Sequence, residues 1–292
     1  MQRDFSDRIL TFIIYFAITI FAVICLYPLI LTLMVSFSDE HLILKYGYKI
    51  IPMKFSTSAY SYLWKSSHKA ILNAYSVTMM VTVVGTLASL LVTSMMAYTM
   101  SQKYVRYRNL ISLYSYFTVL FSAGMVPWYI VCVNFLHINN TFSGLFLPYL
   151  INVWNLFLLK NYFQSIPGSI VESAKIDGAN DLIIFFKLII PLSKTSFLTV
   201  GLFHALQYWN DWWLSIMLIT NNKLFPLQYY LYTMLSNAQA ASSNPAISSH
   251  ISIPAETLKM AVTIVTIGPI IFLYPLVQKY FVKGIMVGAV KG

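Results

Sequence analysis

Charged side chains are scarce in this sequence of 292 residues, and acidic ones are the scarcest. Asp, Glu, Lys and Arg together make up 10% of the chain, against about 25% in ordinary soluble domains, and only 9 residues are acidic. A soluble fold would have to hide the apolar remainder, and the scaling of surface with size does not allow it. The low charge therefore excludes an ordinary soluble domain.

Several catalytic and cofactor motifs are also missing. The chain contains no G-x-x-x-x-G-K-[ST] phosphate loop, no H-E-x-x-H zinc motif and no G-x-S-x-G nucleophile elbow. Its 2 cysteines, Cys25 and Cys132, lie in apolar runs, where free buried thiols are expected, and they lack a metal-binding spacing. We therefore expect that the chain is no enzyme, and that it binds neither a metal nor a cofactor itself.

Apolar residues are what the chain has in abundance. They make up 58% of it, and the mean hydropathy is +0.70. The net charge of +10 indicates loop lysines and arginines near lipid headgroups, because no basic cluster with interleaved aromatic residues suggests nucleic acid. The composition predicts an all-α polytopic membrane protein.

Six stretches are apolar enough to cross a bilayer, which takes about 20 residues of helix. In the second stretch, small residues at every fourth position form one face suited to close helix packing: Gly85, Ser89, Thr93 and Ala97. We predict one membrane domain over residues 1–292, with six spans: Leu10–Ser36, Ala70–Met100, Leu110–Val133, Ser143–Phe163, Ser196–Thr220 and Leu258–Val282.

The distribution of Lys and Arg predicts the orientation. With a cytoplasmic N-terminus, twelve of the 19 basic residues lie inside and seven outside. The C-terminus and the connection of residues 164–195 are then also cytoplasmic. Five lysines between positions 45 and 69 lie outside against this rule, so that segment is an exception or a surface for a partner, either an acidic binding protein or acidic glycans.

The stretch ESAKIDGAND, Glu172–Asp181, is polar although apolar sequence flanks it on both sides. Before it, Pro167 can open a short helix that Ser165 or Ser169 caps. Gly178 can end that helix in a left-handed turn. The stretch therefore predicts a short charged helix outside the hydrocarbon core.

A second helix is predicted directly after this turn. Asn180 can cap it, and Asp181 lies in its first turn, where the helix dipole favours an anion. The apolar run LIIFFKLII stops before Pro191 and, at nine residues, is too short to cross a membrane. From the residues alone, an ordinary cytoplasmic loop without a role explains this insert equally well.

The spelling of the insert resembles the EAA loop of ABC importer permease subunits. That pattern is Glu-Ala-Ala, then Asp-Gly-Ala, then an apolar helix that ends in Leu-Pro. Ser173 replaces the second Ala, and Ile190 stands where Leu often precedes the Pro. The matching residues, at the expected spacing, are Glu172, Ala174, Asp177, Gly178, Ala179 and Pro191.

Two further stretches resemble the carbohydrate-uptake, or maltose-type, branch of this family. The C-terminal sequence YFVKGIMVGAVKG is similar to the tail of the shorter of the two partner subunits, and the triplet Trp209–Asp211 is similar to that group too. The resemblance covers essentially the whole chain. It implies a type I ABC importer transmembrane domain with six helices, a coupling loop over residues 164–195 and a cytoplasmic tail over residues 283–292.

The resemblance also implies partners. In this family the short helix of the insert is a coupling helix that docks on a separate ATPase dimer, which holds ATP and Mg²⁺. A second homologous permease, an extracellular solute-binding protein and an oligosaccharide substrate complete the system, in a bacterial cell membrane. The residues that it places at the ATPase are Glu172, Ser173, Ala174, Asp177, Gly178 and Ala179 of the insert, and Gly288, Val290, Lys291 and Gly292 of the tail.

Candidates for a sugar path lie in the fifth stretch. Sugars are bound by aromatic faces and by amide or hydroxyl groups, and at helical spacing Gln207 and Asn210 share one face while Tyr208 and Trp212 share another. Tyr and Trp are also ordinary anchors at the membrane interface, so this assignment stays open. The lone His204 in the same stretch is expected to be a satisfied packing residue and not a ligand.

Two other functions remain possible. An ABC permease for an amino acid or an osmolyte is disfavoured by the C-terminal tail. A self-contained ion-coupled transporter or membrane enzyme would need acidic residues in the centres of the spans, and the sequence shows none there.

Overall fold

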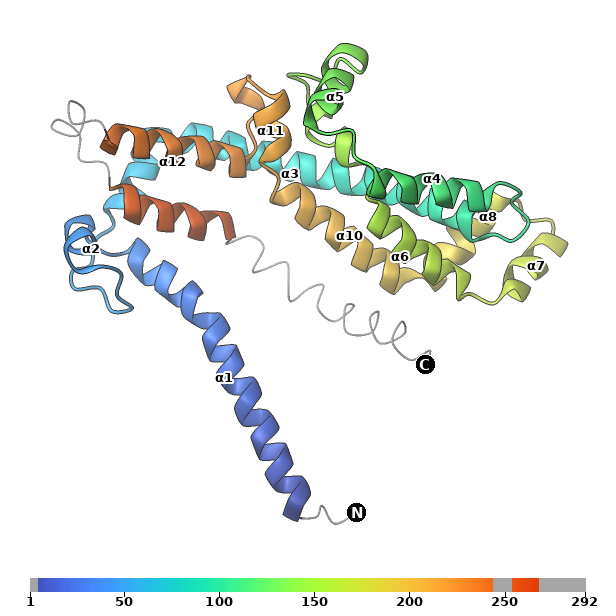
Figure 1. Cartoon of the computed structure of the whole chain (residues 1–292), viewed down its shortest axis with the longest axis horizontal. Helices are drawn as coiled ribbons and strands as arrows, with labels where there is room; N and C mark the ends of the chain where they lie inside the picture. The colour runs from blue at the N-terminus through green and yellow to red at the C-terminus, as the bar shows by residue number, and fades with distance from the viewer. Residues whose placement is uncertain (1–4, 244–253, 268–292) are drawn as a thin grey trace. The chain divides into compact units, whose positions relative to one another are not determined.

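The computed structural model describes residues 5–243 and 254–267 (Figure 1). Among these residues the chain is mainly helical and forms no strand, which confirms the predicted all-α class; one isolated bridge joins Ser38 and Phe55. The described residues divide into two units. The first contains residues 5–68, 231–243 and 254–267, and the second contains residues 69–230.

Helix α1 (Phe5–Ser36) begins the first unit and is apolar around its whole circumference. Its membrane-length part, Ile9–Ser36, has a mean hydropathy of 2.8, and almost all of its side chains are exposed. The hydroxyl groups of Thr19 and Thr32 donate to the carbonyl oxygens four residues earlier, at 2.8 and 2.7 Å. A helix that satisfies its own polar groups and exposes only apolar surface suits lipid. Cys25 lies on this helix and is exposed, so the prediction that it is buried is wrong, whereas Cys132 is buried.

The rest of the first unit is a polar segment and two helical stretches. Asp39 caps the short helix α2 (Glu40–Tyr46), because its side chain accepts from the backbone N–H of His41 at 3.1 Å. Gly47 ends α2 with a left-handed φ of 76°. The long helix α3 (Ser58–Ser101) then begins, and residues 255–267 are helical as well.

The second unit contains the remainder of α3 and a series of shorter helices. The predicted third span is broken, because residues 121–124 separate two helices that meet at 118°. Gly124 has a φ of 84°, a left-handed value that an α-helix cannot continue through. The elements up to the insert are α4 (Arg108–Leu120), α5 (Met125–Ile130), η1 (Val131–Phe135), η2 (Ser143–Leu145), η3 (Leu147–Tyr149) and α6 (Val153–Gln164).

The insert and the helices after it follow α6. The predicted helix end before Pro191 is wrong, since helical structure continues to Leu192. Pro191 lies in the first turn after a π-helical segment, where its missing N–H and fixed φ are tolerated. The elements are α7 (Gly168–Ile176), α8 (Asp181–Ile184), the π-helical η4 (Phe185–Ile189), α9 (Ile190–Leu192), α10 (Lys194–Trp209), α11 (Trp213–Leu218), η5 (Asn222–Leu224) and α12 (Leu227–Ser243).

Helices of membrane-spanning length are fewer in the structure than in the sequence prediction. Two described helices are long and apolar enough, Ile9–Ser36 and His68–Ser101, and there are up to four if each of two bent pairs is one span. The predicted fourth span contains two 3₁₀ turns and the 12-residue α6. Most of the predicted sixth span, 258–282, lies outside the described residues, so a total of six spans stays a prediction.

The core of the second unit lies where α3, α6 and the insert meet. Buried Met100 of α3, Leu156 and Leu159 of α6 and Phe185 of the insert belong to one apolar cluster. The small-residue face of α3 is buried as well. At Gly85 the ring of Tyr208 lies so near that a Cβ on this glycine would be 2.8 Å from a ring carbon. The predicted close packing of this face is confirmed.

Candidate functional site

The turn between α7 and α8 is built from backbone hydrogen bonds. The N–H of Ala179 donates to the carbonyl of Ala174 at 2.9 Å, and the N–H of Gly178 donates to that of Lys175 at 3.1 Å. This pair of bonds is a Schellman motif, whose left-handed position is Gly178 with a φ of 81°. Asn180 then caps α8, its side chain accepting from the N–H of Ile183 at 2.8 Å. The predicted helix end at Gly178 and the predicted helix cap at Asn180 are confirmed.

The start of α7 differs from the prediction. Pro167 itself holds the cap position, its carbonyl accepts from the N–H of Ile170 at 3.2 Å, and no side chain caps the helix. Ser165 donates its hydroxyl to the carbonyl of Tyr162 at 2.7 Å instead. The prediction that Ser165 or Ser169 caps α7 is therefore wrong. The backbone reverses at Pro167 without a capping side chain, which leaves the first N–H groups of α7 without side-chain partners.

The insert turns one face inward and one face outward. Val171 is buried, and Ala174 and Ala179 pack against the core cluster around Phe185, as the apolar contact of a Schellman motif requires. The two alanines predicted at a partner surface are thus half-buried against the core of the chain itself. The outward face contains Glu172, Ser173, Ile176, Asp177 and Gly178, all exposed.

Ile176 is the residue of this face that the sequence analysis missed. It is 86% exposed, at the end of a helix whose other outward residues are polar. A large apolar side chain held so far out of the core is suited to contact with a partner. Its position between Lys175 and Asp177, as a large apolar residue in an otherwise polar stretch, could have indicated in the sequence that it is exposed.

A group of three side chains ties the insert to the loop after α3. The Tyr104 hydroxyl donates to Oδ1 of Asp181 at 2.7 Å, and Nζ of Lys175 lies 3.3 Å from the same oxygen. Nζ of Lys175 also lies 3.3 Å from the centre of the Tyr104 ring. Burial, followed by the hydrogen bond to Asp181, raises the pKa of Tyr104. Tyr104 therefore stays a protonated donor at neutral pH.

One of the two helix faces predicted for the sugar path does not form. Tyr208 is buried, sharing a hydrogen bond of 2.7 Å with the hydroxyl of Ser89 and donating to the carbonyl of Phe146 at 3.0 Å. Helix α10 ends at Trp209, so Trp212 is not one helical turn above Tyr208, and the predicted face of these two does not form. The exposed Asn210 and the half-buried Gln207 remain near the end of α10.

Other predicted residues of this region have structural partners. His204 is fully buried, and its Nε2 lies 3.3 Å from the side-chain amide nitrogen of Asn155. The Asn210 side chain donates to the carbonyl of Leu206 at 2.8 Å. His204 is therefore buried and packed, as the sequence indicated, although its Nδ1 has no hydrogen-bond partner among the described residues.

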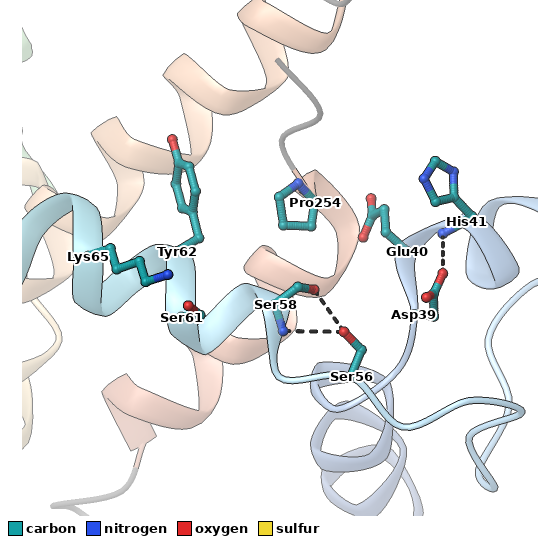
Figure 2. A pocket seen from close by; sticks show the side chains of 9 residues that line it. All are labelled: Asp39, Glu40, His41, Ser56, Ser58, Ser61, Tyr62, Lys65 and Pro254. Atoms are coloured by element: carbon teal, nitrogen blue, oxygen red, sulfur yellow. Dashed lines mark hydrogen bonds between the residues drawn. The ribbon is translucent and has the colours of Figure 1, made fainter. Parts of the chain in front are cut away.

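A cavity of the first unit lies outside the insert, between the polar segment before α3 and the N-terminal part of α3. It has a volume of about 500 Å³ (Figure 2). Ser58, Ser61, Tyr62 and Lys65 of α3 lie on one side of it in Figure 2, and the segment Asp39–His41 lies on the other.

The two carboxylates of this cavity already have partners. Asp39 forms an ion pair of 3.1 Å with Lys54, which lowers its pKa. Both carboxylate oxygens of Glu40 accept bonds, from the N–H of Glu256 at 2.9 Å and from the N–H and hydroxyl of Thr257 at 2.8 Å each. Lys65, in contrast, has no ion-pair partner among the described residues. The cavity thus offers an unpaired ammonium group and several hydroxyls.

No family model matches the chain, but sequence comparison gives long matches. It is 37% identical over 288 residues to the polygalacturonan/rhamnogalacturonan transport system permease protein YtcP of Bacillus subtilis, covering 98% of this chain and 100% of the relative. The chain belongs to the carbohydrate-uptake family of ABC importer permeases. An arabinooligosaccharides transport system permease protein of Halalkalibacterium halodurans is 24% identical, over the full length of both proteins.

A solved structure agrees with this family. A bacterial ABC transporter involved in the import of the acidic polysaccharide alginate contains a chain that matches this permease with a TM-score of 0.81 and 32% identity, covering 95% of this chain and 98% of the other. ABC permeases are transport components, and ATP hydrolysis takes place on a separate subunit. The tail residues predicted at the ATPase, Gly288 and 290–292, lie outside the described residues of the permease.

Proposed function

We propose that this permease is one of two membrane halves of an importer for acidic oligosaccharides, and that α7 is its coupling helix. The observation that carries the coupling role is the outward face of α7, where Ile176 stands among polar side chains while the Schellman turn holds the other face on the core. A short helix fixed in this way can move only together with the elements behind it.

The contact with the ATPase follows from this geometry. Glu172, Ser173, Ile176 and Asp177 of the outward face would enter the partner, with Glu172 as the ionic contact and Ile176 as the apolar one. Ala174 and Ala179 would not contact the partner directly, but would hold α7 in place by packing against the core cluster. ATP and Mg²⁺ would be held by the ATPase dimer, and the tail residues Gly288, Val290, Lys291 and Gly292 would reach that dimer.

An acidic substrate is favoured by two observations. The chain is similar to a polygalacturonan/rhamnogalacturonan permease and to a chain of an alginate importer, both named for acidic polysaccharides. Five lysines lie between positions 45 and 69, three of them in the polar segment before α3 and two in the N-terminal part of α3, and Lys65 lines a cavity without an ion-pair partner among the described residues. We propose that this segment faces outward, as the Lys and Arg distribution predicts, and attracts uronate groups.

The path through the membrane would use the polar residues near the end of α10. Gln207 and Asn210 are accessible enough to contact a sugar, whereas Tyr208 is fully buried. Gln207→Leu should therefore lower uptake without loss of folded protein, and unchanged uptake would remove this residue from the path.

The test is a pull-down of the tagged permease from native membranes in mild detergent, with partners identified by mass spectrometry. Wild type should retain an ATPase, a second permease and a solute-binding protein. Gly178→Glu should lose the ATPase, because it disrupts the turn behind α7. The matched control is Gly47→Glu, which places the same side chain on another left-handed glycine whose Cβ would also meet nothing within 4 Å. A wild-type permease that purifies alone and still transports would disprove the proposal.

A further inference from the structure

We propose that Tyr104 is a positioning residue for α7, which it fixes to the loop between α3 and α4 through Asp181 and Lys175. The inference rests on the proposed coupling role of α7 and adds the element through which a movement of α7 would reach α3. Tyr104, Lys175 and Asp181 are called the α7 clamp below.

The α7 clamp closes over the Schellman turn. Lys175 precedes this turn and Asp181 follows it, so their ion pair of 3.3 Å spans the turn from end to end. Tyr104 lies three residues after the end of α3, and its hydroxyl and ring contact both members of that pair. Three segments of the chain therefore meet at one oxygen atom, Oδ1 of Asp181.

The polar contacts matter because packing at this place is incomplete. A cavity of about 320 Å³ lies between the loop and α7, lined by Gln102, Lys103 and Arg108 on one side and by Gly168 and Glu172 on the other. Close packing transmits displacement, and a space of this size interrupts it. The clamp is thus a direct link between the loop and the end of α7.

The ring and the hydroxyl of Tyr104 can be separated by substitution. Tyr104→Phe keeps the ring face that Lys175 contacts and removes the hydroxyl, which donates to Asp181 and also interacts with the hydroxyl of Tyr98. The matched control is Tyr107→Phe in the same loop, whose hydroxyl has no hydrogen bond to a described residue. Lys175→Met is a second variant, which keeps the side-chain stem and removes the charge.

The first measurement is hydrogen–deuterium exchange of peptides from residues 168–184, in the complete transporter in lipid nanodiscs. Exchange should become about two- to fivefold faster in Tyr104→Phe and Lys175→Met, since losing one partly exposed hydrogen bond changes a local opening equilibrium by that order. Tyr107→Phe should behave like wild type. Wild-type exchange in both clamp variants would overturn the proposal.

The second measurement is the number of substrate molecules transported per ATP hydrolysed, in proteoliposomes with the binding protein. Tyr104→Phe should retain the ATPase and hydrolyse ATP but transport about two- to fivefold less per ATP. An unchanged ratio would overturn the positioning role even if exchange were faster. If wild type retains no ATPase, the proposed function fails, and the exchange measurement alone still decides whether the clamp holds α7.

Discussion

The ring of Tyr208 lies directly against the backbone of Gly85, where a Cβ would come within 2.8 Å of a ring carbon. The ring cannot move away freely, since its hydroxyl is bonded to Ser89 and to the carbonyl of Phe146. Gly85→Ala should therefore lower the stability of the permease by about 1–3 kcal/mol, the usual cost of overpacking. Thermal unfolding in detergent measures this. Gly201→Ala is the control, because its Cβ would meet Leu90 at an ordinary 3.5 Å, and equal effects would contradict the prediction.

The left-handed turn at Gly178 gives a second prediction. A Cβ there meets nothing within 4 Å, so Gly178→Ala adds only backbone strain, about 1–2 kcal/mol. We expect a small drop in unfolding temperature together with a clear loss of transport, because the strain falls on the turn that holds α7. Gly168→Ala, at the first position of α7 and without a left-handed φ, should leave both unchanged. Full transport by Gly178→Ala would contradict this account.

Ile176 should matter for partner binding and not for folding. Burial of an isoleucine contributes about 1.5–3 kcal/mol, so Ile176→Ser should weaken retention of the ATPase by about tenfold or more. The unfolding temperature of the isolated permease should not change, since the side chain is 86% exposed. Binding of the ATPase to immobilised permease measures the loss. Ile51→Ser, at another exposed isoleucine far from the insert in sequence, should bind normally.

Alkaline pH should weaken the first unit through Tyr48. The hydrogen bond that its hydroxyl donates to Glu256, together with burial, raises the pKa of Tyr48 from 10.0 to about 12. The folded pKa is the higher one, so the stabilisation is fully present below pH 10 and is lost as the pH rises through about 12. Tyr48→Phe should unfold at a lower temperature than wild type at pH 9, and the difference should close near pH 12. The matched control is Tyr46→Phe, and a difference independent of pH would refute the assignment.

Transport should depend on the charge of the substrate through Lys65. If the cavity of Figure 2 attracts uronate groups, Lys65→Gln should raise the KM for an acidic oligosaccharide about three- to tenfold, and the effect should shrink at high salt. Transport of a neutral oligosaccharide of equal length should not change. Lys69→Gln, outside the cavity lining, is the control. An equal effect on acidic and neutral sugars would show that Lys65 has only a structural role.

The parts of the insert that sequence predicted correctly depend on neighbours along the chain. Gly178 and Asn180 act through hydrogen bonds that span three to five residues, so their residue types are enough to place a helix end and a helix start. The small-residue face of α3 was predictable for a similar reason, because a period of four residues defines one side of a helix.

Other features depend on residues that are distant in the sequence or on backbone detail. Tyr104 reaches Asp181 across 77 positions, and no local pattern marks a tyrosine that will become the donor of such a bond. The break of the predicted third span at residues 121–124 follows from the conformation of Gly124. The sequence stays apolar enough across this break for the two helices to pass as one span by hydropathy. Tyr208 was assigned to a sugar path from its residue type and its helical spacing to Trp212, whereas its burial depends on the fold of the whole unit.

The π-helical segment η4 has a consequence for the direction in which α7 points. A π turn holds one more residue than an α turn, and each residue of an α-helix turns the chain by about 100°. The number of residues in the segment Phe185–Ile189 thus sets how α8, and α7 before it, are rotated about the helix axis relative to α9 and α10. Deleting one residue there would leave the composition and the hydropathy of the insert almost unchanged, yet it would rotate the outward face of α7, and Ile176 with it, away from the side proposed to contact the ATPase.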